Sequence, residues 1–140
     1  MKLKIKKLHI DAVIPKYAHF DDAGFDLFAI EDTVVKVGER VPVKTGIAME
    51  IPTGYVGLIW DKSGLSVKHG IKTIAGVVDS TYRGEILVAV TNISQENYKF
   101  EKGHKVAQMI IQKKETVEFE EVAELSETKR GEGRLGSTGK

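Results

Sequence analysis

The chain is 140 residues long, and its 21 basic and 20 acidic side chains leave a formal net charge of +1. This balance argues against stable, sequence-independent binding to nucleic acid, and no apolar run is long enough for a membrane-spanning helix. The absence of cysteine excludes disulfides, thiol nucleophiles and thiolate metal sites, and is compatible with a soluble cytoplasmic protein.

Apolar and polar residues alternate along much of the chain, which is typical of half-buried β-strands. The alternation is clearest in residues 3–6, 35–37, 41–44, 47–51 and 117–120. Residues 85–91 and 106–111 are more uniformly apolar, as expected of strands covered on both faces. Glycine- and proline-containing turns separate these segments at short intervals. The pattern predicts an all-β sandwich or barrel formed by a single domain over residues 1–128.

Residues 63–70 break this pattern and predict one short helix. Ser63 is a suitable N-cap residue, Lys68 and His69 are basic residues for the last turn, and Gly70 is a suitable stop. A helix that begins beside Lys62 presents oriented N–H groups and a positive charge to an anion. The segment therefore predicts an anion site, and the alternative is that Ser63 is only a cap.

The last residues, 129–140, predict a flexible glycine-rich arm with the chemistry of a phosphate cradle. Repeated glycines allow backbone N–H groups to approach an anion, while Arg130 and Arg134 supply guanidinium groups and Ser137 and Thr138 supply hydroxyls. The alternative is an ordinary solvated terminus. The glycine spacing from Gly131 to Gly136 also fits a dinucleotide fingerprint, but too few residues follow for the helix that this motif requires.

Five segments resemble, in order, the motifs of the trimeric dUTP diphosphatase (dUTPase) family. They are Ala23–Leu27, Lys62–Leu65, Gly76–Glu85, Gly103–Gln108 and the tail from Arg130. The resemblance implies a jelly-roll-like β subunit that forms a homotrimer with active sites at the subunit boundaries. It implies Mg²⁺-dependent hydrolysis of dUTP to dUMP and pyrophosphate, which keeps uracil out of DNA and supplies dUMP for thymidylate synthesis.

For the nucleoside, the resemblance implies recognition by the segment that contains Gly76, Val77, Val78 and Tyr82. A fixed pattern of main-chain groups there would pair with uracil and reject cytosine, because buried polar groups would be left unpaired. Tyr82 would pack on the deoxyribose and exclude a 2′-hydroxyl. The alternative for Tyr82 is a half-exposed aromatic residue on a strand.

Asp79 is the expected catalytic residue. It lies between the strand-like residues 74–78 and a turn, where its carboxylate can be held rigidly. In the family that the chain resembles, the aspartate that matches Asp79 orients and deprotonates the attacking water. This role requires the carboxylate to lie within hydrogen-bond reach of that water. The alternative is an aspartate that only forms the turn.

For the phosphates, the resemblance implies contacts from Lys62, Ser63 and Gly64, and from Gln108 on a neighbouring strand. Gln108 could instead be a polar residue on an exposed strand face. Asp26 matches an aspartate that reaches the metal through water. Magnesium suits this arrangement because it keeps several waters and takes its other ligands from substrate phosphates.

The tail is expected to close over the bound nucleotide and to exclude water, as lids do. Arg130, Gly136, Ser137 and Thr138 would meet the phosphates, and Leu135 would cover the base.

The chain departs from the family pattern at four positions. Lys62 replaces an arginine and loses its bidentate fork, and Asp61 replaces an uncharged residue, usually proline. The Asp61 carboxylate would repel phosphate unless a metal or Lys62 compensates it. Leu135 replaces an aromatic residue and Arg134 a glycine, so we expect a functional lid that closes less firmly.

Two other functions remain open at this point. One is a dCTP deaminase-like or bifunctional enzyme on the same fold, although its serine/arginine-rich stretch and catalytic glutamate are not found here. The other is a nucleotide-binding or regulatory β protein without catalysis, because a binding site can outlast its chemistry.

Overall fold

The computed structural model describes residues 1–134, which form ten β-strands and one short helix. In chain order the elements are β1 (Lys4–Lys7), β2 (Phe25–Phe28), β3 (Thr33–Val35), β4 (Arg40–Glu50), β5 (Tyr55–Trp60), α1 (Ser63–His69), β6 (Ile71–Thr73), β7 (Val77–Val78), β8 (Glu85–Asn92), β9 (Tyr98–Phe100) and β10 (Lys105–Lys113). The predicted all-β class with one short helix is therefore confirmed.

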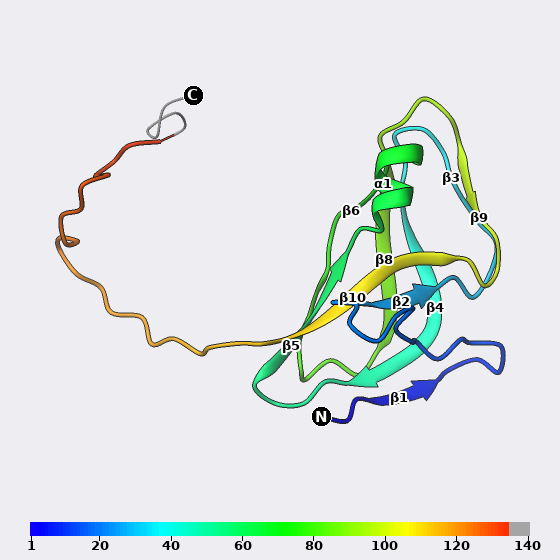
Figure 1. Cartoon of the computed structure of the whole chain (residues 1–140), viewed down its shortest axis with the longest axis horizontal. Coiled ribbons are helices and arrows are strands. Elements are labelled where there is room, and N and C mark those ends of the chain that lie inside the picture. Colours follow the sequence, from blue (N-terminus) through cyan, green and yellow to red (C-terminus); the bar gives the residue numbers. More distant parts are fainter. Residues whose placement is uncertain (135–140) are drawn as a thin grey trace.

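The strands form three antiparallel sheets that stay open within the described part of the chain. The two larger sheets have the orders β1-β4-β8-β6 and β2-β10-β5-β7, and β3 pairs with β9 in a third. Figure 1 shows α1 and the β3–β9 pair at one end of the body and β1 at the other. Strands distant in sequence are neighbours in each large sheet, as in a jelly-roll-like fold.

The core lies between the two large sheets and is built from the inward-facing residues of both. Leu27 and Met109 come from one sheet and Val43 and Val88 from the other, and all four are fully buried with Phe100 of β9. Burying one such side chain stabilises the fold by about 1.5–3 kcal/mol. The core therefore fixes the two sheets against each other and sets the positions of the loops between them.

Several of the predicted strand segments differ in the structure. Residues 41–44 and 47–51 lie almost entirely in one long strand, β4, whose pairing with β8 shifts register between Lys44 and Ala48. Residues 117–120 alternate in sequence but are not a strand, and their prediction as one is wrong. Beyond β10 these residues pair with no other strand of the described chain, so they lack the ladder that a strand requires.

The outer face of β8 is more open than its apolar sequence predicts. Ile86, Val88 and Val90 are buried, whereas the side chain of Leu87 between them is 43% exposed. β8 is antiparallel to both of its neighbours, and in a single chain only one of its faces packs on the core. The expectation that this strand is covered on both faces is therefore not met within one chain.

The helix α1 ends as predicted but begins differently. Gly70 adopts the left-handed conformation (φ 61°), and its N–H caps the helix by donating to the carbonyls of Leu65 and Ser66. The N-cap residue is Lys62, which makes no side-chain capping bond, so Ser63 is the first helical residue and not the cap. Across residues 1–134, no helix has the length and apolar content needed to cross a bilayer.

The chain leaves the body after β10. Lys114 still donates its N–H to the carbonyl of Gly54 at 2.9 Å, but residues 115–134 are exposed and contain neither helix nor strand. Figure 1 shows this segment, in orange and red, extending away from the sheets. In the described structure it contributes nothing to the core of its own chain.

Candidate functional site

The first part of the site is a small cavity beside β5, β7 and the start of β8. Its lining includes Gly76, Val77, Val78, Asp79 and Tyr82, the residues predicted to meet the nucleoside and the water. The cavity has a volume of about 210 Å³. This is below the roughly 300 Å³ at which pockets for drug-sized ligands begin, so it suits one ring better than a whole nucleotide.

Gly76 is fixed against the neighbouring strand. Its carbonyl oxygen accepts the N–H of Ile59 at 2.8 Å, next to the β5–β7 pairing of Leu58 with Val77. A Cβ on Gly76 would lie 2.6 Å from the carbonyl oxygen of Ile59, which is a backbone atom and cannot swing away. Only glycine fits here without displacing one wall of the cavity.

Asp79 directly follows β7 and begins the turn toward β8. Its carbonyl oxygen accepts the N–H of Tyr82 at 3.1 Å, and Arg83 Nη1 donates to the carbonyl of Ser80 at 2.7 Å. Asp79 remains exposed, and its carboxylate makes no hydrogen bond or ion pair with the described residues. The turn therefore holds this carboxylate at the cavity while leaving it open to water.

Tyr82 contributes its ring to the same cavity. Its hydroxyl donates to the carbonyl of Glu85 at 3.0 Å, which ties the ring across the turn, and the residue is 46% exposed. A half-exposed aromatic ring held at its far end offers one face to a ligand.

The second part of the site is a carboxylate held between two lysines. The Asp26 side chain, on β2, is only 6% exposed, and its Oδ1 binds Lys62 Nζ at 2.5 Å while its Oδ2 binds Lys105 Nζ at 2.7 Å. Burial by itself raises the pKa of Asp26, but hydrogen bonds from Lys105 and Lys62 outweigh it and hold this pKa below its ordinary value. Asp26 is therefore an ionised counter-ion to two cations.

Gln108 connects this cluster to the segment before α1. On β10 it lies opposite Asp26 of β2 and opposite Trp60 of β5, so its side chain is on the same face as Asp26. Gln108 Nε2 donates to the carbonyl oxygen of Asp61 at 2.8 Å. The amide thus lies beside the start of the predicted phosphate-binding segment and not on a free strand face.

Asp61 is compensated differently from our expectation. Its carboxylate accepts hydrogen bonds from Thr73 N at 2.6 Å and Thr73 Oγ1 at 2.8 Å, and it forms an ion pair with Lys72. Lys62 binds Asp26 instead. Burial raises the pKa of Asp61, but the bonds from Lys72 and Thr73 lower it further, and the net direction is downward. The Asp61 carboxylate therefore binds β6 and holds the predicted phosphate-binding segment, residues 62–64, next to that strand.

The remaining predicted residues lie apart from the cavity. Ser63 and Gly64 form the exposed first turn of α1, and a Cβ on Gly64 would meet only open space. Arg130 Nε donates to the carbonyl of Gly133 within the extended C-terminal segment. Leu135, Gly136, Ser137 and Thr138 lie outside the described residues.

The predicted site residues therefore fall into two groups on one sheet. The cavity lies at β5 and β7, and the lysine–carboxylate cluster lies at β2 and β10 of the same sheet. Lys62, Ser63 and Gln108 do not line the cavity within one chain.

Two lysines near the site were missed by sequence analysis. Lys105 pairs with Asp26, and Lys72 pairs with Asp61. Lys105 lies within the segment Gly103–Gln108 that carries the family resemblance, but its partner depends on strand register. The sequence offered no signal for Lys72.

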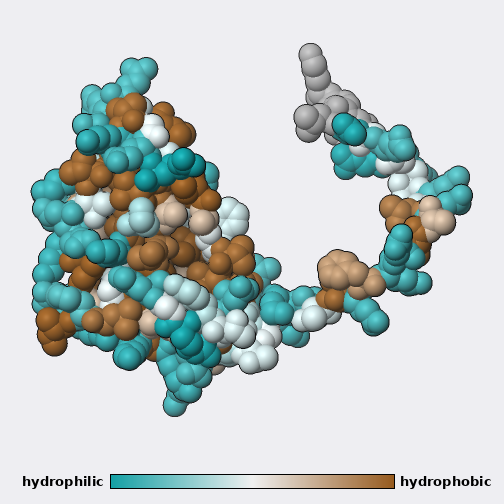
Figure 2. Space-filling view, turned by 180° about the vertical axis from the view of Figure 1, so that it is seen from behind, coloured by the Kyte–Doolittle hydropathy of each residue, from teal (hydrophilic) through white to brown (hydrophobic). Residues whose placement is uncertain are grey.

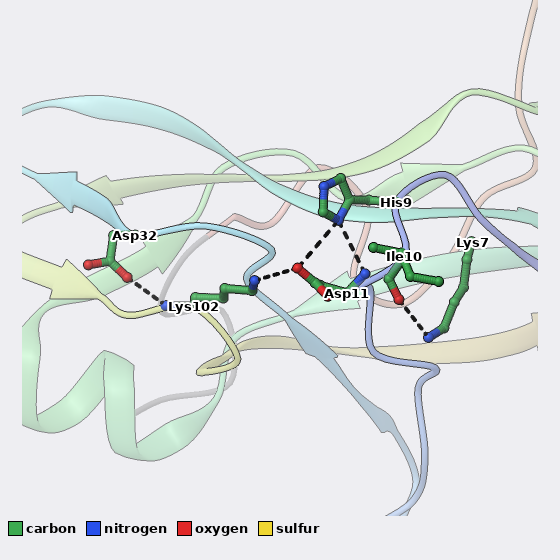
Figure 3. Close-up of polar contacts among 6 residues, drawn as sticks. All are labelled: Lys7, His9, Ile10, Asp11, Asp32 and Lys102. Atoms are coloured by element: carbon green, nitrogen blue, oxygen red, sulfur yellow. Dashed lines mark hydrogen bonds and ion pairs between the residues drawn. The ribbon is translucent and has the colours of Figure 1, made fainter.

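A separate polar cluster fastens the turn that precedes β10 (Figure 3). Lys102 Nζ donates to Asp11 Oδ2 at 2.7 Å, its backbone N donates to Asp32 Oδ1 at 2.9 Å, and Asp11 N donates to His9 Nδ1 at 3.2 Å. The hydrogen bond and charge of Lys102 hold the pKa of Asp11 below its ordinary value. This cluster joins three loops and fixes the start of the strand that carries Lys105 and Gln108.

The described residues offer no group of three or more His, Asp or Glu side chains arranged to hold a metal ion. Asp26, which we expected near the metal, has each oxygen bound by an ammonium group. These residues do not fit a metal held directly by protein ligands. They are compatible with an ion that binds to the phosphates of a substrate and keeps its own water ligands.

The fold and the site define an all-β protein with a ring-sized cavity next to main-chain groups and a lysine cluster on the same sheet, which are features of a nucleotide-binding site. The dUTPase family model matches residues 11–139, so the chain belongs to the dUTPase family.

Curated relatives carry the name deoxyuridine 5'-triphosphate nucleotidohydrolase. The protein of Nautilia profundicola is 49% identical over 142 residues and covers 100% of both chains, and that of Clostridium kluyveri is 44% identical and covers 99% of each. Among solved structures, a dUTPase of Staphylococcus bacteriophage 80alpha with dUPNHPP superposes with a TM-score of 0.92 at 31% identity, covering 99% of this chain and 98% of that one. A mutant dUTPase from phage phi11, described with a structural Mg(II) ion, has a TM-score of 0.82 at 29% identity and covers 89% and 98% of the two chains.

Proposed function

We propose that this protein hydrolyses dUTP to dUMP and pyrophosphate. Beside its membership of the dUTPase family, one observation carries the proposal. The five residues predicted to read the nucleoside and activate water, from Gly76 to Tyr82, line a single cavity.

The base would be read mainly by the main chain of residues 76–82. Gly76 is locked to β5 by the hydrogen bond from Ile59, so the N–H and C=O groups that follow it have fixed directions. Uracil matches one pattern of donors and acceptors, and cytosine reverses part of it. A rigid pattern rejects the wrong base because its buried polar groups would stay unpaired. Tyr82 would cover the deoxyribose.

Asp79 would act as the general base. Its carboxylate takes a proton from a water molecule, the water oxygen forms a bond to phosphorus, and the bridging bond between the α- and β-phosphates breaks to release pyrophosphate. The carboxylate has no cation in the described chain that would compete for it, which suits this role.

The triphosphate would be held by Lys62, Ser63, Gly64 and Gln108. Gln108 and Lys62 are tied together through Asp61 and Asp26, so they form one preorganised unit. Magnesium would enter on the phosphates and, when bound, neutralise part of their charge. Contact between Asp26 and that ion through water stays a prediction. The reaction would take place in the cytoplasm.

A homotrimer would complete the site, because the cavity and the lysine cluster are separate within one chain. Apolar side chains gather on the face of the body seen in Figure 2. Around the cavity, Trp60, Ile74, Val77 and Leu87 are large and exposed. We propose that these exposed apolar residues around the cavity pack against neighbouring subunits. We also propose that the C-terminal arm, with Arg130 and residues 135–138, closes over a bound nucleotide.

The proposal is tested by measuring pyrophosphate release from dUTP, dTTP, dCTP and UTP. We expect release from dUTP alone at an appreciable rate. A dCTP deaminase-like enzyme would instead release ammonia from dCTP, and a regulatory nucleotide-binding protein would bind dUTP without turnover. Either result would overturn the proposed function.

A further inference from the structure

Asp26 is the most buried charged residue in the described structure, and a lysine ammonium group lies on each side of its carboxylate. Its side chain is 6% exposed, and each carboxylate oxygen binds a different ammonium group. Lys62 is the residue directly before α1, and Lys105 is the first residue of β10. A buried carboxylate with two cationic partners does not arise from surface charge pairing, because burying an ion is costly unless it is fully compensated.

A β-bulge directs Lys105 toward Asp26. Gln108 lies opposite Asp26 and Ala107 opposite Leu27, but Lys105 lies opposite Phe28, so one extra residue of β10 is inserted between Lys105 and Ala107. Without the bulge, strict alternation would place Lys105 on the opposite face from Gln108. With it, Lys105 shares the face of Asp26 and Gln108. Bulges commonly redirect a side chain next to a functional site.

The cluster keeps a net positive charge and free donors. Two ammonium groups against one carboxylate leave +1, and each ammonium has three N–H donors, of which Asp26 needs one. The Lys62 side chain is 28% exposed and that of Lys105 is 46% exposed, so both ammonium groups can be reached from solvent. Because they bind the two oxygens of one carboxylate, they are separated by no more than the span of a polyphosphate.

We propose that Lys105 is a second phosphate-binding cation beside Lys62, and that Asp26 is the positioning residue that holds both ammonium groups toward the triphosphate. The inference rests on the proposed function, since it names a further part of the same site. It assigns Asp26 a role that does not depend on a metal ion.

The test measures binding by calorimetry with the full chain, using the non-hydrolysable analogue dUpNHpp and, as a phosphate-free control, deoxyuridine. Each titration is run in EDTA and again with Mg²⁺. The variants are Lys105→Met, Asp26→Asn and a matched control, Lys44→Met, whose exposed ion pair with Glu31 lies outside the cluster. Thermal melting checks that each variant is folded.

We expect Lys105→Met to weaken dUpNHpp binding by roughly tenfold, equally in EDTA and in Mg²⁺. Its affinity for deoxyuridine and the dUpNHpp affinity of Lys44→Met should be unchanged. Lys105→Arg, which keeps the charge, should restore most of the affinity. Asp26→Asn should also weaken dUpNHpp binding in EDTA. General electrostatics alone would make it tighter, because the substitution removes a negative charge from an anion site.

Three outcomes would overturn the inference. They are unchanged affinity in Lys105→Met, equal or tighter binding in Asp26→Asn, and a loss in Asp26→Asn that occurs only with Mg²⁺, which would assign Asp26 to the metal. If Asp26→Asn does not fold, the half-exposed Lys105 carries the test alone. Failure of the unmodified chain to bind dUpNHpp would instead contradict the proposed function, so the two failures are distinguishable.

Discussion

The carbonyl oxygen of Gly76 accepts the N–H of Ile59 at 2.8 Å, at a point where a Cβ on Gly76 would lie 2.6 Å from the Ile59 carbonyl oxygen. This contact joins the proposed base-reading segment to the central sheet. We predict that Gly76→Ala raises the KM for dUTP by at least about tenfold, because the loop must move away from β5 and misalign its main-chain groups. Steady-state kinetics check this, and melting curves confirm the fold. An unchanged KM would show that the base is not read by this loop.

Asp79 is predicted to act in the chemical step and not in binding. Asp79→Asn should lower kcat by about 10²-fold or more, because a general base contributes typically 10²–10⁴-fold, while dUpNHpp binding stays within a few-fold. Single-turnover kinetics and calorimetry separate the two effects. Glu31→Gln, which removes an exposed carboxylate paired with Lys44, is the matched control and should keep full activity. Loss of binding together with turnover would indicate a structural aspartate.

The C-terminal arm is predicted to close the site. Truncation after Lys129 removes Arg130 and the residues beyond it, and should lower turnover by about tenfold or more because the lid no longer excludes water or contacts the phosphates. The melting temperature should hardly change, since residues 115–134 lie outside the core. Turnover and dUTP affinity equal to those of the full chain would contradict the lid.

Asp61 is predicted to stabilise the fold in a pH-dependent way. Its pKa is lower in the folded chain than in the unfolded chain, so its contribution is present above the unfolded pKa and is lost as the pH falls through the folded one. Asp61→Asn should cost about 1–3 kcal/mol at pH 7, and the difference should shrink as the pH falls below about 4. Urea unfolding at both pH values measures it. A cost that is equal at both would show that the charge of Asp61 does not contribute.

The subunit contact is predicted to involve the open face of β8. Leu87→Glu places a charge on a half-exposed apolar position and should convert a trimeric mass to that of one chain in light scattering. A monomeric mass for the unmodified protein would contradict the proposed trimer.

The sequence predicted the β class, the single helix and its stop at Gly70, because alternation and capping are local properties. It also brought Gly76, Asp79 and Tyr82 together, since these residues are close in the chain and one turn places them on one cavity. These parts of the site needed no knowledge of strand pairing.

The sequence could not predict contacts that depend on register. The pairing of Lys105 with Asp26 follows from a bulge in β10, and the pairing of Asp61 with Lys72 follows from how the segment after β5 meets β6. A one-residue change of register reverses every side chain, and neither feature has a local signature. The alternation at 117–120 misled the strand prediction because alternation alone does not supply a partner strand.

The most direct test of the central claim is a crystal structure of the unmodified protein with dUpNHpp and Mg²⁺. We predict that the uracil ring binds in the cavity of residues 76–82, paired with main-chain groups, and that the Asp79 carboxylate faces a water molecule beside the triphosphate. A ring bound elsewhere, or an Asp79 carboxylate turned away from the triphosphate, would contradict it.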